Sequence, residues 1–143
     1  MLISTRGRYA LRIMIDLAEH QNEEYIALNE IARRQEISEK YMESIVRMLV
    51  KARMVDSLRG KGGGYRLKGS PDRYTVGSIL RLTEESLAPV ACLEPGSEVC
   101  PRMARCATLP VWQGLEQVIN EYLDGITLAQ LLEGRDNEND YVI

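Results

Sequence analysis

The sequence contains little of what marks several common classes of protein. Its 143 residues include no phenylalanine, one tryptophan, one histidine and three cysteines. No apolar run approaches the roughly 18 residues that a membrane-spanning helix needs, and no uncharged apolar stretch follows Arg6, Arg8 and Arg12 to form a secretory signal. A single histidine gives thin support to an enzyme with a cysteine nucleophile, because the nucleophile needs a nearby base. We therefore expect a cytoplasmic protein without enzymatic activity or a membrane partner, in which the cysteines are reduced.

The composition predicts a packed protein with an uneven distribution of charge. Hydrophobic residues make up 45% of the chain and charged residues 27%, which is ordinary for a globular protein. The net charge of −3 combines a basic half, residues 1–68 with thirteen Lys or Arg and nine Asp or Glu, with an acidic half, residues 69–143 with five and twelve. This asymmetry indicates contact with nucleic acid through one end of the protein, although charged faces often meet only solvent.

The N-terminal half predicts a winged helix-turn-helix. Apolar residues recur at helical spacing in three segments, and two short strand patterns then flank a glycine-rich turn. The expected elements are helices over residues 5–20, 28–35 and 39–53 and strands over residues 55–58 and 65–68. A helix, a short helix, a turn, an amphipathic helix and a glycine hairpin follow one another in the order of that motif.

The C-terminal half predicts an irregular loop between helices. A fourth helix is expected over residues 75–84, and residues 86–108 then break all periodicity. Pro110 suits the first turn of a long helix, whose apolar stripe is too extensive for a lone helix and is expected to be buried. The stripe consists of Val111, Leu115, Val118, Ile119 and Tyr122. Thr127 is expected to cap a last short helix, beyond which the polar residues 135–140 fray.

The polar face of the third predicted helix has the residue types of a DNA-reading surface. Ser38 is placed to cap this helix. Glu43 and Ser44 can read base edges, because a carboxylate accepts a hydrogen bond from the amino group of cytosine, while basic side chains can reach phosphates. The basic residues of this face are Lys40, Arg47 and Lys51. Tyr41 can either pack or contact the DNA backbone, and the face as a whole can also be the solvated side of a core helix.

The glycine-rich turn after the first strand predicts a wing. A phosphate-binding P-loop is excluded, because a strand pattern rather than a helix follows the glycines. Gly60 and Gly62 allow the tip of the hairpin to approach another molecule closely. Arg59 and Lys61 are therefore predicted to contact phosphates or a narrow groove. A flexible hairpin with no role is the alternative, and the helix-turn-helix pattern just before it favours the wing.

Three cysteines on the irregular loop predict a metal centre. Cys92, Cys100 and Cys106 are separated by seven and five residues. Thiolates suit iron–sulfur clusters and zinc, and a loop rich in Pro and Gly offers little core in which cysteines can be buried as small hydrophobic residues. A structural zinc site with Glu94 or Glu98 as fourth ligand, and redox-active free thiols, are the alternatives to a cluster.

Four segments make the chain resemble the Rrf2 family of bacterial winged-helix transcription regulators. They are Ser-Thr-Arg-Gly-Arg-Tyr-Ala-Leu at 4–11, Ile-Ser-Glu-Lys-Tyr-Met-Glu at 37–43, Arg-Gly-Lys-Gly-Gly-Gly-Tyr at 59–65 and Ile-Thr-Leu-Ala-Gln-Leu at 126–131. The resemblance extends over nearly the whole chain and implies a homodimer that forms through the long helix near 110–123. It also implies that Glu43 is the base-reading acid of the recognition helix and that Arg59 enters the minor groove.

The resemblance bears on the cysteines as well. The iron–sulfur members of the family, the IscR, NsrR and RirA groups, carry three cysteines in this loop, and the spacing here is similar to that of the RirA group. The chain departs from the family in the fourth ligand, because Leu109 stands where IscR-like members have a histidine and Arg8 stands where NsrR-like members have an acid. Glu94, Glu98, water or a small thiol are then the candidates, and both a two-iron (2Fe–2S) and a four-iron (4Fe–4S) cluster stay open.

Together these features predict a mostly α-helical fold with a small β-hairpin wing. A winged helix-turn-helix DNA-binding domain is expected over residues 1–69, the cysteine loop and dimerisation helices over 70–134, and a polar C-terminal tail over 135–143. The predicted function is a sequence-specific transcriptional regulator, acting as a repressor on pseudo-palindromic double-stranded DNA, whose DNA affinity is controlled by an iron–sulfur cluster. The alternatives are the same regulator with a zinc site or redox-active thiols, and a protein–protein adaptor that uses the winged fold without DNA.

Overall fold

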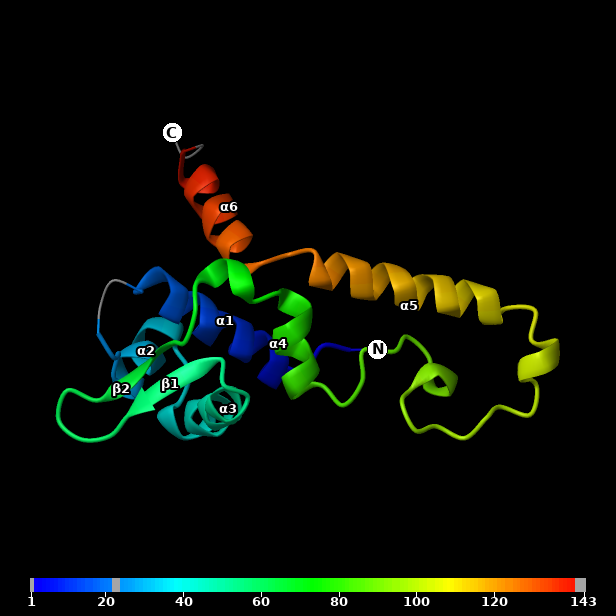
Figure 1. Ribbon diagram of the computed structural model, residues 1–143, viewed down its shortest axis with the longest axis horizontal. Helices are drawn as coiled ribbons and strands as arrows, with labels where there is room; N and C mark the ends of the chain where they lie inside the picture. Colours follow the sequence, from blue (N-terminus) through cyan, green and yellow to red (C-terminus); the bar gives the residue numbers. More distant parts are fainter. Residues whose placement is uncertain (1, 22–23, 141–143) are drawn as a thin grey trace.

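The computed structural model describes residues 2–21 and 24–140, and it shows a helical head from which one long helix extends (Figure 1). Two antiparallel strands form a hairpin beside the helices of the head. The predicted fold class, mostly α-helical with a small β-hairpin, is therefore confirmed. In chain order the elements are α1 (Thr5–Glu19), α2 (Leu28–Gln35), α3 (Glu39–Lys51), β1 (Val55–Leu58), β2 (Gly64–Leu67), the 3-10 turn η1 (Pro71–Arg73), α4 (Val76–Thr83), the 3-10 turns η2 (Ala91–Leu93) and η3 (Met103–Arg105), α5 (Leu109–Asp124) and α6 (Leu128–Asp140).

Helix α1 lies at the centre of the head. It begins after Ser4, whose hydroxyl oxygen accepts a hydrogen bond from the Gly7 N–H at 3.0 Å and so satisfies one of the free donors of the first turn. The buried face of α1 packs against α2, α3, α4 and α6. Its core residues are Ala10, Ile13, Met14, Leu17 and Ala18. Helices α4 and α6 share this core with the first three helices. The packing therefore continues across residue 69, and the domain boundary at that residue stays a prediction.

A buried carboxylate fixes the turn that precedes α3. Asp16 of α1 is 1% exposed and accepts hydrogen bonds from the Arg34 guanidinium at 2.7 and 3.0 Å and from the Gln35 amide at 2.8 Å. These bonds compensate the charge of the buried carboxylate and hold the end of α2 against α1. Glu36 then takes a left-handed conformation with φ 56°, which ends α2 and allows Ser38 to cap α3.

The hairpin is joined to the head by backbone pairing. Val55 pairs with Leu67 and Leu58 with Gly64, while Tyr65 and Ile26 exchange two backbone hydrogen bonds of 2.8 Å. A side chain at position 64 would bring a Cβ within 2.1 Å of the Ile26 carbonyl oxygen, and the φ of Gly64 is 152°. Glycine at this position therefore allows the wing to lie against the segment between α1 and α2.

Helix α5 is attached to the head by the C-terminal end of the helix. The segment between η1 and α4 pairs there with the segment between α5 and α6: the Val76 N–H donates to the Ile126 carbonyl and the Leu128 N–H to the Tyr74 carbonyl, both at 2.9 Å. The rest of α5 extends outward beside the loop over residues 84–108 (Figure 1). Its apolar stripe is exposed in the single chain, in contrast to the expectation of burial: Val111 is 59%, Leu115 41%, Val118 61% and Tyr122 67% exposed.

Element ends differ from the predicted ones where the backbone conformation changes. Helix α3 ends at Lys51 rather than at residue 53, because Arg53 has a positive φ of 62°. Helix α6 continues to Asp140 instead of fraying from residue 135, and the last three residues of the predicted tail lie outside the described residues. In the described part of the chain, no helix combines the length and apolar character that crossing a membrane requires.

Candidate nucleic-acid interface and cysteine loop

Helix α3 buries one face and presents the other to solvent. Met42, Ile45 and Leu49 are fully buried in the core, and this spacing of three and four residues orients the helix. The opposite face carries the polar residues that the sequence predicted for DNA contact, and all of them are exposed: Lys40, Glu43, Ser44, Arg47 and Lys51. The amphipathic pattern therefore places every predicted reading or phosphate-binding side chain of α3 in reach of a ligand.

The exposed face of α3 is partly organised by internal contacts. Arg47 lies 3.4 Å from the Glu43 carboxylate, one turn away, and both side chains are more than half exposed. Such an exposed pair contributes little to stability, so Glu43 is free to exchange this partner for a base amino group. The Ser44 hydroxyl donates to the Tyr41 carbonyl at 2.8 Å, and Ser38 accepts from the Tyr41 N–H at 3.3 Å.

Tyr41 has a packing role in the structure. Its ring meets the ring of Tyr9 edge to face, with 5.7 Å between the centroids, and the Arg12 guanidinium lies 5.1 Å from the centroid of Tyr9. Edge-to-face aromatic pairs of this kind add to the energy of packing. Tyr41 therefore anchors the start of α3 on α1, and its contact with DNA stays a prediction.

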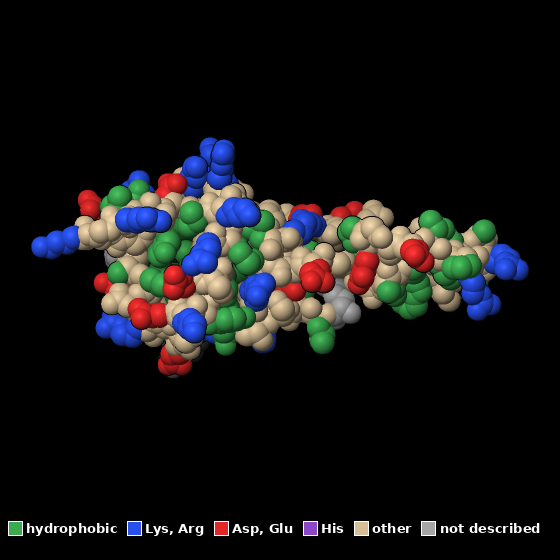
Figure 2. Space-filling view, turned by 90° about the horizontal axis from the view of Figure 1, so that it is seen from below, with side chains coloured by type: hydrophobic (Ala, Val, Ile, Leu, Met, Phe, Trp, Pro, Cys, Tyr) green, Lys and Arg blue, Asp and Glu red, His purple; other side chains and the backbone are tan. Residues whose placement is uncertain are grey.

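The wing and α3 frame a common groove of about 530 Å³. Glu43 and Arg47 line it from α3, and Arg59 with Gly60 lines it from the turn of the hairpin. Arg59, Gly60, Lys61 and Gly62 are exposed, and the two glycines have φ values of 93° and 77° that favour glycine. Figure 2 shows Lys and Arg side chains spread over this side of the head, with a few acidic side chains among them. The structure thus brings the two predicted DNA-contacting segments to one surface.

Two residues that support this surface were not singled out from the sequence. The Arg66 guanidinium lies 4.3 Å from the centroid of the Tyr25 ring, which holds β2, the strand of the wing next to the head, to the segment before α2. Tyr25 and Arg66 are forty-one positions apart in the sequence, so no local pattern predicts the contact.

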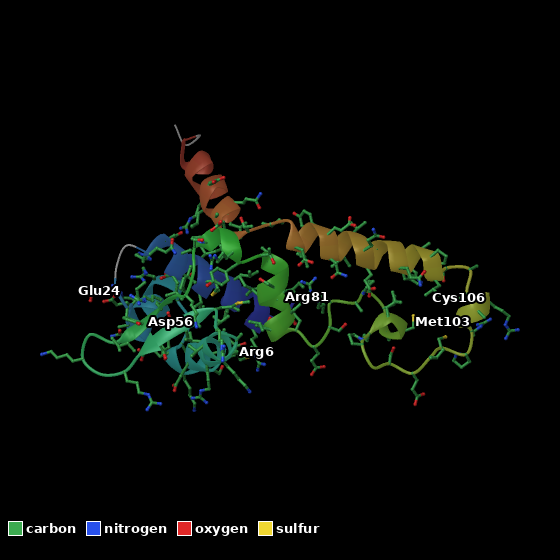
Figure 3. All side chains as sticks on the ribbon, viewed as in Figure 1. Arg6, Glu24, Asp56, Arg81, Met103 and Cys106 are labelled. Atoms are coloured by element: carbon green, nitrogen blue, oxygen red, sulfur yellow. The ribbon has the colours of Figure 1, made fainter. Side chains whose placement is uncertain are left out.

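The three cysteines lie on the loop between α4 and α5, and each is partly buried. Cys92 is in η2, Cys100 precedes η3 and Cys106 follows it, near the outer end of α5 (Figure 3). The pKa of Cys106 is lowered, first by hydrogen bonds with the side chain and backbone of Thr108 and also by the charge of Arg102. A lowered pKa favours the thiolate, the form that binds metal.

The loop does not gather a complete ligand set. Within residues 2–21 and 24–140, no three His, Cys, Asp or Glu side chains lie close enough together to hold a metal ion. Glu94 and Glu98 are exposed on the same loop, and Leu109 is the first residue of α5. The donor chemistry fits a thiophilic centre, so binding requires the loop to close around it. His20 lies at the C-terminal end of α1, with its Nδ1 2.7 Å from the Asp16 carbonyl oxygen, so it belongs to the head and not to the cysteine loop.

A helix-turn-helix whose second helix, α3, presents a polar face to solvent, followed by a glycine-tipped hairpin, defines a winged-helix DNA-binding protein. A family model described as "Rrf2: Iron-dependent Transcriptional regulator" matches residues 3–134. The chain belongs to the Rrf2 family of transcriptional regulators.

Named relatives and solved structures agree with this assignment. The chain is 41% identical to the transcriptional regulator IscR of Aliivibrio salmonicida over 96% of its own length and 80% of the relative, and 39% identical to Protein rrf2 of Nitratidesulfovibrio vulgaris over 92% and 87%. Its fold is similar to that of T. potens IscR, with a TM-score of 0.76 and 36% identity over 100% of this chain and 93% of that one. It is equally similar to CymR, the global cysteine regulator of B. subtilis, with a TM-score of 0.76 and 38% identity over 92% and 95%.

These findings establish the class of activity. The chain is a DNA-binding transcriptional regulator of the IscR/Rrf2 type and not an enzyme. The similar structures include both IscR and CymR.

Proposed function

We propose that the protein is a homodimeric repressor that binds a pseudo-palindromic operator through α3 and the wing, and whose affinity is controlled by an iron–sulfur cluster at Cys92, Cys100 and Cys106. The observation that carries the DNA-binding part is the shared groove between the exposed face of α3 and the turn of the hairpin. An α-helix fits the major groove, and a flanking basic tip fits the adjacent backbone or minor groove.

The residues around this groove divide into reading and positioning groups. Glu43 and Ser44 face outward from the middle of α3 and read base edges. Lys40, Arg47 and Lys51 supply phosphate contacts that set the register of the helix. Arg59 and Lys61 extend this contact from the wing, where a narrow minor groove attracts basic side chains.

The exposed stripe of α5 supports the homodimer. Four large apolar side chains on one face of this helix are at least 41% exposed in the single chain, and a stripe of this extent is expected to be covered by a partner. A second copy of the chain, packed along α5, covers both stripes at once under two-fold symmetry. The two α3 helices then meet half-sites about one helical turn apart, near 34–36 Å.

The cysteine loop is joined both to the head and to α5. Its first residue, Glu84, accepts hydrogen bonds from the N–H and hydroxyl of Ser4 at 2.9 and 2.7 Å, which ties the loop to the N-terminus of α1. Its last residues lead directly into α5. An iron–sulfur cluster would supply a centre that is sensitive to oxidants and to iron supply. Closure of the loop by the three thiolates would pull on both attachments and so alter how the head sits on α5.

A selection with fragments of the source genome tests the DNA-binding proposal. Purified protein is mixed with sheared genomic DNA, bound fragments are sequenced, and the experiment is repeated with Glu43→Ala. We expect the wild type to enrich a two-fold symmetric sequence and the variant to enrich it weakly or not at all. Fragments without a common symmetric sequence would overturn the proposal.

Chemical analysis of protein purified without oxygen tests the cluster. We expect iron and acid-labile sulfide in comparable amounts, lost together in the Cys92→Ser, Cys100→Ser and Cys106→Ser variants. Zinc without sulfide would replace the cluster by a structural zinc site, and neither metal nor sulfide would leave thiol chemistry as the source of control.

A further inference from the structure

The junction between α4 and α5 is where the long helix meets the head. Helix α5 packs against α4, while its apolar stripe faces solvent in the single chain. Leu123 joins a small apolar cluster with Val76 and Leu80 of α4. The direction of α5 relative to the head is therefore determined near its last turns.

Arg81 of α4 forms a two-pronged contact with α5 at this junction. Its Nη1 donates to Oδ1 of Asp124 at 2.6 Å and its Nη2 donates to Oδ2 at 3.0 Å, while Nη2 also donates to the Asn120 side-chain oxygen at 2.9 Å. Asn120 and Asp124 are one turn apart on α5, so the planar guanidinium spans two successive turns of one helix face. The hydrogen bonds between Arg81 and Asp124 raise the pKa of Arg81 and lower the pKa of Asp124.

Gly77 allows the two helices to approach this closely. A Cβ at position 77 would lie 2.1 Å from Oδ1 of Asp124 and 2.9 Å from Nη1 of Arg81. Gly77 and Arg81 are one turn apart on α4, and they face the matching pair Asn120 and Asp124 on α5. We call these four residues the α4–α5 clamp.

Beyond the clamp the helix separates from the head. A cleft of about 430 Å³ opens there, lined on one side by Arg81, Leu87 and Leu93 and on the other by Glu116 and Asn120. Figure 3 labels Arg81 at the edge of α4 that faces α5. The cleft leaves room for α5 to change its angle relative to the head. The clamp therefore restrains the helix near its C-terminal end, while its N-terminal part can swing.

Because α5 is long, a small change in its angle to the head displaces its far end by a distance that matters for DNA binding. The stripe of α5 begins at Val111, thirteen residues before Asp124, which corresponds to about 20 Å of helix. A swing of about 10° displaces the far end by roughly 3.4 Å, the rise of about one base pair. In a dimer that forms along α5, small changes of angle at the clamp therefore change the distance between the two DNA-binding heads by about the rise of one base pair.

We propose that the α4–α5 clamp is a specificity-determining element that fixes the half-site spacing accepted by the dimer. This inference rests on the proposed dimer along α5. Arg81 is 42% and Asp124 46% exposed, and an isolated exposed ion pair contributes little to folding stability. The effect is therefore expected in spacing selectivity rather than in unfolding.

The test measures affinity for duplexes that carry the selected half-site in four arrangements. They are the natural spacing, the spacing lengthened by one base pair, the spacing shortened by one base pair, and a single half-site. The variants are Arg81→Gln, Asp124→Asn and Gly77→Ala; Arg81→Lys, which keeps the charge but not the planar fork, serves if Arg81→Gln does not yield folded dimer. Arg73→Gln and Glu121→Gln are matched controls, since each removes one charge from an exposed position of η1 or α5. Dimer mass and helical content are measured for every protein.

The wild type is expected to prefer the natural spacing by roughly tenfold or more, as a misplaced half-site loses base contacts. Each clamp variant should lower this ratio by about two- to fivefold, with unchanged affinity for the single half-site, and the two controls should retain the wild-type ratio. Folded dimeric variants with the wild-type spacing profile would overturn the inference alone. A wild type that binds one half-site as well as two would instead overturn the proposed dimeric function and the clamp's role with it.

Discussion

Replacing Gly64 by alanine should detach the wing from the head and lower the stability of the protein. Gly64 opens β2 with φ 152°, and a Cβ there would lie 2.1 Å from the Ile26 carbonyl oxygen and 2.4 Å from its carbon. Neither atom belongs to a flexible side chain, so the strand itself must move. That movement breaks the two hydrogen bonds of 2.8 Å by which Tyr65 and Ile26 are joined.

The expected loss is the sum of two effects. Two backbone hydrogen bonds contribute about 1 kcal/mol each to stability, and an alanine held in a conformation that favours glycine costs about 1–3 kcal/mol. We therefore expect Gly64→Ala to lower the free energy of unfolding by about 3–5 kcal/mol, a large part of the total for a small domain.

Gly62→Ala provides the matched control in the same hairpin. Gly62 also has a positive φ, 77°, but nothing lies within 4 Å of the position of its Cβ, so only the backbone strain of about 1–2 kcal/mol applies. Urea unfolding of the two variants and the wild type measures the difference, and operator affinity shows whether the wing has moved. Equal losses of stability would refute the reasoning that contact with Ile26 is what requires glycine at position 64.

Three further predictions concern reading, packing and the ligand set. Glu43→Ala should cost roughly 1–3 kcal/mol on the operator and little on random DNA, while Lys51→Ala should weaken both alike and reduce the salt slope by about one unit; an unchanged ratio of specific to random affinity for Glu43→Ala would contradict the assignment. Asp16→Asn should lower the free energy of unfolding by about 1.5–3 kcal/mol, because a neutral amide replaces the buried carboxylate that accepts charge-assisted hydrogen bonds from Arg34 at 2.7 and 3.0 Å; urea unfolding with an unshifted midpoint would contradict this. Leu109→His should retain iron and sulfide longer in air by adding an imidazole donor at the start of α5, and equal lifetimes in two folded proteins would mean that another group already completes the set.

The elements of the DNA-binding surface could be predicted because their signals are local. Ser38 caps α3, as its place just before a periodic apolar segment predicted. The second helix occurs with the predicted bounds, Leu28–Gln35. The wing follows from a run of glycines between two short strand patterns, and its only error of placement is the shift of β2 by one residue to Gly64.

The contacts that position these elements could not be predicted, because they join distant residues. Arg81 and Asp124 lie on helices separated by the irregular cysteine loop, and Asp16 meets Arg34 across the turn after α1. No periodicity pairs such residues. The cysteines show the same limit: spacing identifies three donors, whereas the fold of the loop places them apart.

The exposed stripe of α5 illustrates a further limit. Apolar periodicity correctly indicated a helix with one water-avoiding face, but a single chain leaves that face uncovered, with Tyr122 67% exposed. The apolar pattern of one sequence indicates that this face of the helix must be covered. The same pattern results whether the rest of the chain or a second copy of the chain covers it.

The most direct test of the account is the operator affinity of one preparation before and after removal of its cluster. Protein purified without oxygen is titrated against the selected operator, the cluster is removed by chelation, and the titration is repeated alongside the variant with all three cysteines replaced by serine. We predict that the two forms of the wild type differ in affinity by about 5- to 150-fold, the range of a coupling free energy of about 1–3 kcal/mol, and that the serine variant matches the cluster-free form in both conditions. Identical affinities before and after removal, in folded dimeric protein, would contradict control of DNA binding at Cys92, Cys100 and Cys106.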